Sequence, residues 1–251
     1  MDRLIYTAYS GMTSSTVRQR VIASNMANAQ TIGFRAEMLT TTPMTLKGPS
    51  LEARAMTDGE VHGASMAQGS LIETGKPMDV ALVGDTMLSV QAEDGSEVYT
   101  RRGDLSISAG GVLQNGDNRP VIGEGGPITV PLGSKVTISP DGGVNVANPE
   151  APDQPPQNVG RIKIASITGS RIDKGLDGLF RVVGQNGQAG GVLPQDEEAK
   201  LMVGSLEQSN VDPTRILVEM VEAQRLFDIR TKLVSQAREV DESSSALMRI
   251  S

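Results

Sequence analysis

Residues that break helices are distributed so unevenly along this chain that they divide it into three zones. Residues 1–30 contain one glycine, Gly11, and no proline, whereas residues 214–251 contain neither glycine nor proline. Most of the 28 glycines and 13 prolines fall between about 75 and 200. Because uninterrupted runs permit long helices and Gly and Pro mark turns, the sequence predicts helical ends around a turn-rich middle.

The C-terminal run has the pattern of one long helix. Asp212 stands at the N-cap position, and Pro213 fits the first helical position, where its missing N–H costs nothing. Mostly apolar residues repeat on two adjacent faces at steps of about 3.5 residues, the coiled-coil period. The first stripe is Ile216, Met220, Ala223, Phe227, Arg230, Val234 and Ala237, and the second is Leu226, Ile229, Leu233, Gln236, Val240, Ser243, Leu247 and Ile250.

The N-terminal run shows a similar spacing but weaker helix propensity. Its stripe mixes apolar, small and polar residues: Ile5, Ala8, Met12, Ser15, Gln19, Ile22, Met26 and Ala29. Thr, Ser and Val lower the propensity, and helices without tertiary packing are marginal in water. Asn28 and Gly33 are suitable residues to end this helix. The shared period predicts that the two ends pair, either as a stem within one monomer or through contacts that build rings or filaments.

The middle of the chain has the pattern of short antiparallel strands. Turn signals such as Asp94-Gly95, Asn115-Gly116 and Asp141-Gly142 separate segments with partial alternation. The expected strands are 80–83, 87–91, 98–101, 105–108, 136–138, 144–146, 161–167 and 180–183. Residues 148–156 form a polar, proline-rich loop by composition.

These observations predict a mainly β fold with terminal α-helices. The central antiparallel β domain is expected to be a sandwich or a partly open barrel. The predicted division is an N-terminal helix in 1–34, an extended linker with possible short strands in 35–74, the β domain in 75–200, and a C-terminal helix in 201–251.

Composition argues against most catalytic chemistry. The chain has no cysteine, one histidine (His62), and only 2% aromatic residues. Disulfides and thiolate metal sites are therefore excluded, and a histidine-based metal site or triad has little to build on. The net charge of −7 lacks the basic field that nucleic-acid binding needs. We expect no catalytic residue, no cofactor and no metal, and no nucleic-acid partner.

Two segments only superficially look like ligand sites. The stretch 69–76 has one residue too many between its glycines for a phosphate loop, and Pro77 replaces the Ser or Thr that binds Mg²⁺. The pair Glu197-Glu198 is expected to be a solvated face rather than a catalytic carboxylate pair. A secreted β-rich enzyme or carbohydrate-binding module acting on the cell wall remains the alternative class, which the poverty of aromatics disfavours. No run approaches the roughly 18 apolar residues of a membrane helix, and the N-terminus lacks the apolar region of a cleaved signal.

Motifs along almost the whole chain resemble those of the bacterial flagellar rod and hook proteins. Ala23-Ser24-Asn25-Met26-Ala27-Asn28, followed by Thr31-Ile32-Gly33-Phe34-Arg35, is similar to the family's N-terminal signature. The other matching segments, in order, are Pro77–Leu82, Tyr99–Gly103, Arg119–Gly123, Leu206–Asp212 and Met220–Arg225. Met87 and Leu88 depart from the pattern, because much of the family carries aromatic residues there. Within the family, the N-terminal sequence most resembles the proximal-rod member, with the distal-rod member as the alternative.

The resemblance implies a non-enzymatic structural subunit of the basal-body rod that helps to transmit motor torque. It implies export through the flagellum's own type III apparatus without a cleaved signal. The family's terminal segments are disordered in free subunits and form an inner coiled-coil layer on assembly. The implied partners are other axial proteins, including a second copy of this chain, and the export apparatus, without membrane insertion. We expect the assembly interface to include Ile5, Met12, Ile22, Asn25, Met26, Asn28, Ile216, Met220, Ala223, Phe227, Leu233, Val234 and Val240.

Overall fold

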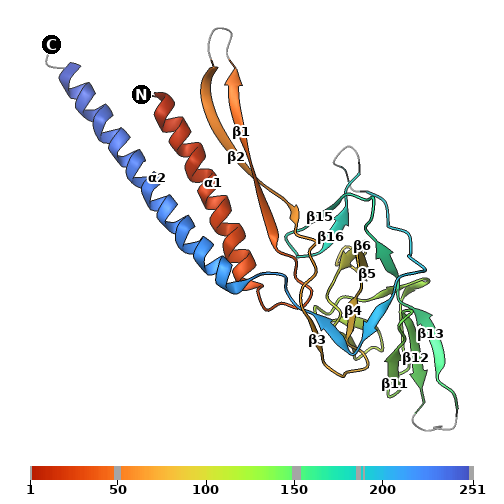
Figure 1. The fold of residues 1–251 in the computed structure, drawn as a ribbon. Coiled ribbons are helices and arrows are strands. Elements are labelled where there is room, and N and C mark those ends of the chain that lie inside the picture. The colour runs from red at the N-terminus through yellow and green to blue at the C-terminus, as the bar shows by residue number, and fades with distance from the viewer. Residues whose placement is uncertain (1, 48–51, 149–153, 185–187, 189, 249–251) are drawn as a thin grey trace. The chain divides into compact units, whose positions relative to one another are not determined.

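The computed structural model describes residues 2–47, 52–148, 154–184, 188 and 190–248, which fold as two units (Figure 1). The helical unit contains Met1–Ala29, Glu37–Gly63 and Val211–Ser251, so it draws on both ends of the chain. The β unit contains Gln30–Ala36 and Ala64–Asn210. The chain therefore passes from one unit to the other at four points in the sequence.

Two long helices and one pair of strands make up the helical unit. Helices α1 (Asp2–Ala27) and α2 (Pro213–Met248) lie side by side (Figure 1). Strands β1 (Glu37–Lys47) and β2 (Glu52–Ala64) pair with each other. The sequence assigned residues 35–74 little regular structure because they are polar and weakly periodic, and these two strands occupy most of that stretch.

The ends of both helices follow from local chemistry. The Asp212 carboxylate accepts hydrogen bonds from the backbone N–H groups of Thr214 (2.9 Å) and Arg215 (3.3 Å), which confirms the predicted N-cap of α2. Helix α1 ends immediately before Asn28, whose side chain donates to the carbonyl of Ser24 at 2.9 Å. The Asn28 amide thus satisfies one of the carbonyls that a helix leaves unpaired at its end.

Short antiparallel strands build the β unit. The largest sheet has the order β14-β5-β6-β16-β15, and smaller sheets pair β17 with β4, β18 with β3, β7 with β8, β10 with β9, and β12 with both β11 and β13. The strands are β3 (Leu71–Glu73), β4 (Val80–Leu82), β5 (Thr86–Gln91), β6 (Glu97–Thr100), β7 (Leu105–Ile107), β8 (Leu113–Asn115), β9 (Ile122–Gly123), β10 (Gly126–Pro127), β11 (Lys135–Ile138), β12 (Gly143–Ala147), β13 (Gln157–Arg161), β14 (Ile164–Ser166), β15 (Ile172–Lys174), β16 (Phe180–Val182), β17 (Leu201–Val203) and β18 (Ser205–Glu207).

The structure confirms the mainly β class, the antiparallel sheets and the two terminal helices. No sheet of the described residues closes as a barrel. The single strand expected over 161–167 is in fact two, β13 and β14. Between them, the N–H of Ile162 donates to Gly142 and the N–H of Lys163 donates to Ile122, so each residue joins a different neighbour. Part of the proline-rich loop, 149–153, lies outside the described residues.

Strand β5 is buried on both faces, which places the core of the β unit. Consecutive residues of a strand point to opposite faces, and Leu88 and Met87 accordingly belong to two different apolar clusters. Both are fully buried, so aliphatic side chains fill the space at the two positions where the family often carries aromatics. The larger cluster is aliphatic throughout and includes Val80, Leu82, Val90, Val98, Leu113, Val121, Val144 and Ile162.

Candidate assembly interface

The first stripe of α2 lies on the side of the helix that faces α1. Ile216 and Ala223 are buried, and Phe227 and Val234 are half-buried. On α1 the covered residues include three serines, Ser10, Ser14 and Ser15, beside Val21 and Ile22. The contact between the two helices is thus made partly of small polar side chains, which explains the weak apolar pattern of α1.

A cation crosses this contact. The guanidinium of Arg230 donates to the carbonyl of Gly11 and to the hydroxyl of Ser15. A side chain at position 11 would begin 3.6 Å from Arg230 Nε, in ordinary contact. Arg230 lies within the first stripe of the sequence pattern, and it pairs with the backbone of α1 instead of packing as an apolar residue. One polar residue in such a position fixes the register of two helices.

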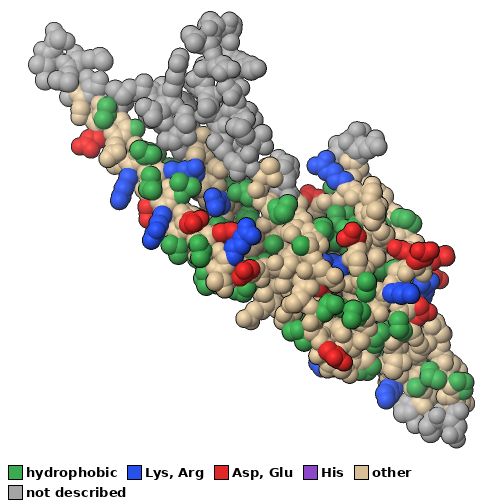
Figure 2. Space-filling model, viewed as in Figure 1, with side chains coloured by type: hydrophobic (Ala, Val, Ile, Leu, Met, Phe, Trp, Pro, Cys, Tyr) green, Lys and Arg blue, Asp and Glu red, His purple; other side chains and the backbone are tan. Residues whose placement is uncertain are grey.

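The second stripe of α2 is exposed at Ile229, Leu233 and Val240, whereas Leu226 at its start is half-buried. Ile229, Leu233 and Val240 retain 56%, 55% and 56% of their surface, and Val218 retains 56% on the preceding turns. Figure 2 shows apolar side chains between charged ones along this helix. Because folded chains rarely leave an apolar stripe of this length in water, the stripe has the character of an unoccupied contact surface.

Asn25 joins the last turn of α1 to the first residue of β1. Its side-chain amide donates to the carbonyl of Glu37 (3.0 Å) and its oxygen accepts from the N–H of Glu37 (2.8 Å). The hydroxyl of Ser24 donates to the Glu37 carboxylate at 2.9 Å. Next to this junction, a groove of about 570 Å³ lies between α1, β1 and α2, with Arg18 and Leu226 in its lining.

The structure separates the interface residues expected from the sequence into three groups. Ile22, Asn25, Ile216 and Ala223 are buried within the chain; Met12, Met26, Asn28, Phe227 and Val234 are half-buried; Met220, Leu233 and Val240 are exposed. The side chain of Ile5 lies outside the described residues. Among the expected interface residues whose side chains are described, the exposed ones all lie on α2.

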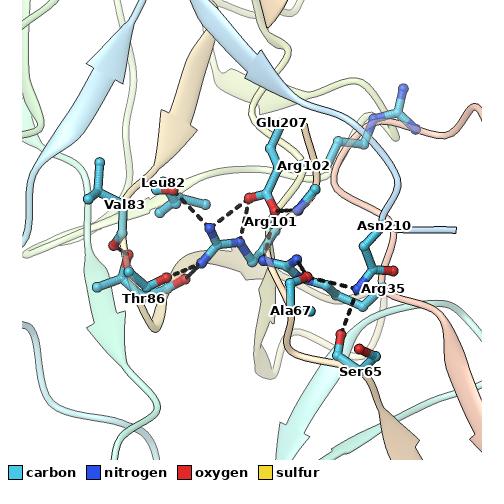
Figure 3. A network of polar contacts seen from close by, with 12 residues as sticks. Arg35, Ser65, Ala67, Leu82, Val83, Thr86, Arg101, Arg102, Glu207 and Asn210 are labelled. Carbon is cyan, nitrogen blue, oxygen red and sulfur yellow. Dashed lines mark hydrogen bonds and ion pairs between the residues drawn. The ribbon is translucent and has the colours of Figure 1, made fainter. Parts of the chain in front are cut away.

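The β unit contains a buried ionic network centred on Glu207 (Figure 3). Oxygen Oε1 of this carboxylate is 2.8 Å from Nη2 of Arg35, and Oε2 is 2.6 Å from Nη2 and 2.7 Å from Nε of Arg101. All three side chains are at most 2% exposed. Arg101 also donates to the carbonyls of Leu82, Gly84 and Thr86 at 2.7 to 2.8 Å, so the body of the β unit determines its position.

Three chain segments converge on this network. The N–H of Gly33 donates to the carbonyl of Glu207 (2.7 Å), and the N–H of Gly69 donates to its carboxylate (2.8 Å). The side chain of Arg35 donates to the carbonyl of Ala67. Segments 30–36, 64–69 and 207–210 are thereby bonded to one another.

Asn210 continues the same network on the other side of Arg35. Its side-chain oxygen accepts from the N–H of Ala36 at 2.7 Å. Its side-chain nitrogen donates to the carbonyls of Ser65 (2.9 Å) and Ala67 (2.8 Å). One side chain therefore bridges the same three segments a second time.

Two guanidinium groups share one carboxylate, so the network carries a net positive charge. Burial lowers the pKa of Arg35, the neighbouring charge of Arg101 lowers that pKa further, and Glu207 opposes both effects. Arginine nevertheless stays protonated in proteins. Asp85 acts on Arg35 in the same sense as Glu207 but forms no bond in the network, so removal of the Glu207 carboxylate would leave two buried cations without a bonded counter-charge, which is strongly destabilising.

Glycine is required where the backbones approach within the network. A Cβ at Gly69 would lie 2.0 Å from the carbonyl oxygen of Gln208. At Gly33 the backbone has φ +68°, and a Cβ would lie 2.4 Å from the carbonyl carbon of Arg101. At both positions a neighbouring backbone lies too close for a side chain. Gly33 also has the left-handed conformation, which glycine adopts without strain.

The network residues come from the motifs that carry the family resemblance, although the sequence did not single them out. Arg35 closes the N-terminal signature, Arg101 lies in Tyr99–Gly103, and Glu207 and Asn210 lie in Leu206–Asp212. The sequence feature that could have located the network is that each of these separated motifs carries a charged or amide residue.

Comparisons with known proteins match the chain in three regions. The model of the family described as flagella basal body rod protein matches residues 5–35. The flagellar hook protein FlgE/F/G D1 domain matches 81–146, and the flagellar basal body rod FlgEFG protein C-terminal region matches 202–247.

Similar proteins cover the chain from end to end. The flagellar basal-body rod protein FlgF of Salmonella typhimurium is 39% identical over 252 residues, covering 100% of both chains. FlgF of Escherichia coli is 39% identical and covers 94% of each chain. FlgG of Bacillus subtilis is 30% identical, with 96% of this chain and 97% of the relative covered.

Proposed function

The chain belongs to the flagellar basal-body rod protein family, and on this premise we propose that it is a structural subunit of the proximal rod that helps to transmit motor torque. It is a non-enzymatic member of an axial assembly in the basal body. The identity of 39% to FlgF of Salmonella typhimurium and Escherichia coli, against 30% to FlgG of Bacillus subtilis, favours the proximal position over the distal alternative. Over the described residues, neither helix combines the length and apolar character needed to span a bilayer.

The exposed second stripe of α2 is the observation that carries this proposal. One face of α2 is already covered by α1, so Ile229, Leu233 and Val240 need a partner from outside the chain. Helices of neighbouring axial subunits, including a second copy of this chain, supply apolar faces of matching period in a coiled-coil layer. Such heterologous contacts propagate into a helical rod.

The remaining parts of the proposal assign a role to each part of the chain. Residues 1–34 and 201–251 carry the assembly helices, 35–74 an extended segment, and 75–200 the central β domain. The interface includes the thirteen positions expected from the sequence: Ile5, Met12, Ile22, Asn25, Met26, Asn28, Ile216, Met220, Ala223, Phe227, Leu233, Val234 and Val240. Export from the cytoplasm through the flagellar type III apparatus, without a cleaved signal, is supported by family membership alone.

An aspartate on the exposed stripe tests the proposal. Leu233→Asp should leave the purified chain folded, because the side chain is exposed, yet abolish rod assembly and swimming when it replaces the native chain. Leu176→Asp in the β unit is the control for adding a charge at an exposed leucine, since Leu176 is fully exposed, and it should preserve motility. Rods and swimming at the native level with Leu233→Asp would contradict the proposed interface. Phe227→Asp is also expected to block incorporation, but Phe227 is half-buried within the chain and gives a less specific test.

A further inference from the structure

We propose that Glu207 anchors both terminal segments of the chain to the β unit through a buried ionic junction, which helps to carry force that passes between this unit and the helices. This inference rests on the proposed function in the rod. The chain leaves or enters the β unit after Ala36, before Ala64, after Asn210 and before Gln30. Ala36, Ser65 and Asn210 lie at or next to the first three of these points, and they are hydrogen-bonded to one another in the network around Glu207. Gly33 lies three residues after the fourth point, Gln30, and donates to the carbonyl of Glu207.

The ionic bonds of the junction are better suited to holding the chain segments in position than to raising the stability of the whole fold. A buried Arg–Glu–Arg group is not more stabilising than apolar residues that fill the same volume. Its charge-assisted hydrogen bonds have fixed directions, whereas apolar contacts are non-directional and permit sliding. A junction made of such bonds therefore keeps the segments in one geometry when they are pulled.

The bonds are arranged in series from the body of the β unit outwards. Three carbonyls between Leu82 and Thr86 hold Arg101, and Arg101 holds the Glu207 carboxylate. Glu207 in turn holds Arg35 through its carboxylate and Gly33 through its carbonyl. Because each link fixes the next, loss of the central carboxylate breaks this path from the core to 30–36 and 64–69, while the hydrogen bond from Lys174 to the carbonyl of Arg35 (2.9 Å) and the packing of Ala64 and Met66 against the Met87 cluster remain.

Native-state hydrogen exchange on the full-length chain distinguishes this anchoring from a contribution to global stability. The reporters are the amides of Gly33, Ala36 and Gly69, which donate to Glu207 or Asn210. The reference amides are Leu113 and Val121 in the core. In Glu207→Gln we expect all these amides to exchange faster, because two buried cations lose their bonded counter-charge, but we expect the acceleration of the reporters to exceed that of the reference amides by at least about tenfold.

Arg102→Met is the matched control for this measurement. Arg102 follows Arg101 in the chain and pairs with Asp104 and Asp117 outside the network, so its loss should leave the reporters unchanged. Unchanged reporters in Glu207→Gln, or equal acceleration of reporter and reference amides, would overturn the inference.

A second variant keeps the test decisive if Glu207→Gln does not fold. Arg35→Lys retains the positive charge but replaces a planar fork by a single point donor. It should accelerate exchange at Gly33 and Ala36 while Leu113 stays protected, and no change at these two amides would again contradict anchoring. These measurements need no rod, so their failure is separate from a failure of the Leu233→Asp assembly test.

Discussion

The β unit and the helical unit use apolar residues in different ways. Strand β5 presents Met87 to one cluster and Leu88 to another, and both side chains are fully buried within the chain. Helix α2 also carries apolar residues on two faces, but Leu233 and its neighbours on the second face remain exposed. The β unit therefore buries both faces of strand β5 within the chain, whereas the second face of α2 leaves Ile229, Leu233 and Val240 exposed.

Replacing a leucine by alanine in each of the two units should give the largest difference in the free energy of unfolding. Leu88→Ala should lower the free energy of unfolding by about 3 to 5 kcal/mol, because it leaves a cavity in a packed core. Leu233→Ala should change that free energy by less than about 0.5 kcal/mol, since the side chain is already in water. Urea unfolding of the two variants checks this, and equal losses would contradict the difference between the units.

A methyl group at Gly33 should weaken the junction within the β unit. Gly33→Ala combines left-handed strain with a clash against the backbone of Arg101, and we expect a loss of about 2 to 4 kcal/mol in unfolding free energy. Gly178→Ala is the control, because Gly178 has φ +77° but open space around it, so it isolates the strain. If thermal unfolding shows the same loss of unfolding free energy in both variants, the short distance between Gly33 and the backbone of Arg101 does not contribute to stability.

Loss of the Asn25 side chain should act on the helical unit alone. Asn25→Ala removes the two hydrogen bonds between its side chain and the backbone of Glu37, which costs about 1 to 3 kcal/mol locally. Amide exchange at Glu37 should rise while Leu113 in the β unit is unaffected. Ser24→Ala, which removes only the bond to the Glu37 carboxylate, should have a smaller effect.

The hydroxyl of Tyr99 accepts a 2.7 Å hydrogen bond from the N–H of Leu193. Burial raises the pKa of Tyr99 to about 12 from its ordinary value of 10.0. The unfolded chain then loses this proton first, so stability is unchanged below pH 10 and falls as pH rises from 10 to 12. Tyr99→Phe should show a shallower fall over that window in alkaline unfolding curves, and an identical slope would contradict the assigned pKa.

Sequence patterns located the elements that depend on local chemistry. Asp212 and Pro213 placed the start of α2, and alternation placed strands such as β4, β5 and β12. The split between β13 and β14 could not be predicted, because it depends on which neighbour Ile162 and Lys163 each meet.

The candidate sites were predictable only in part. The apolar period of α2 marked both stripes, but which stripe α1 covers depends on Arg230 finding Gly11 and Ser15. The Glu207 network joins residues that are far apart in sequence, and a buried charge has no local pattern of its own. Only the presence of Arg35, Arg101 and Glu207 in separate motifs pointed toward it.

The central claim is that a neighbouring subunit covers the exposed stripe of α2 in the rod. Because the chain has no cysteine, Leu233→Cys introduces a single thiol whose reaction with a maleimide can be followed in the free chain and in isolated basal bodies. The account predicts rapid labelling of the free chain, little or no labelling in assembled rods, and full labelling once the rods are denatured. Equal labelling rates in the rod and in the free chain would contradict it.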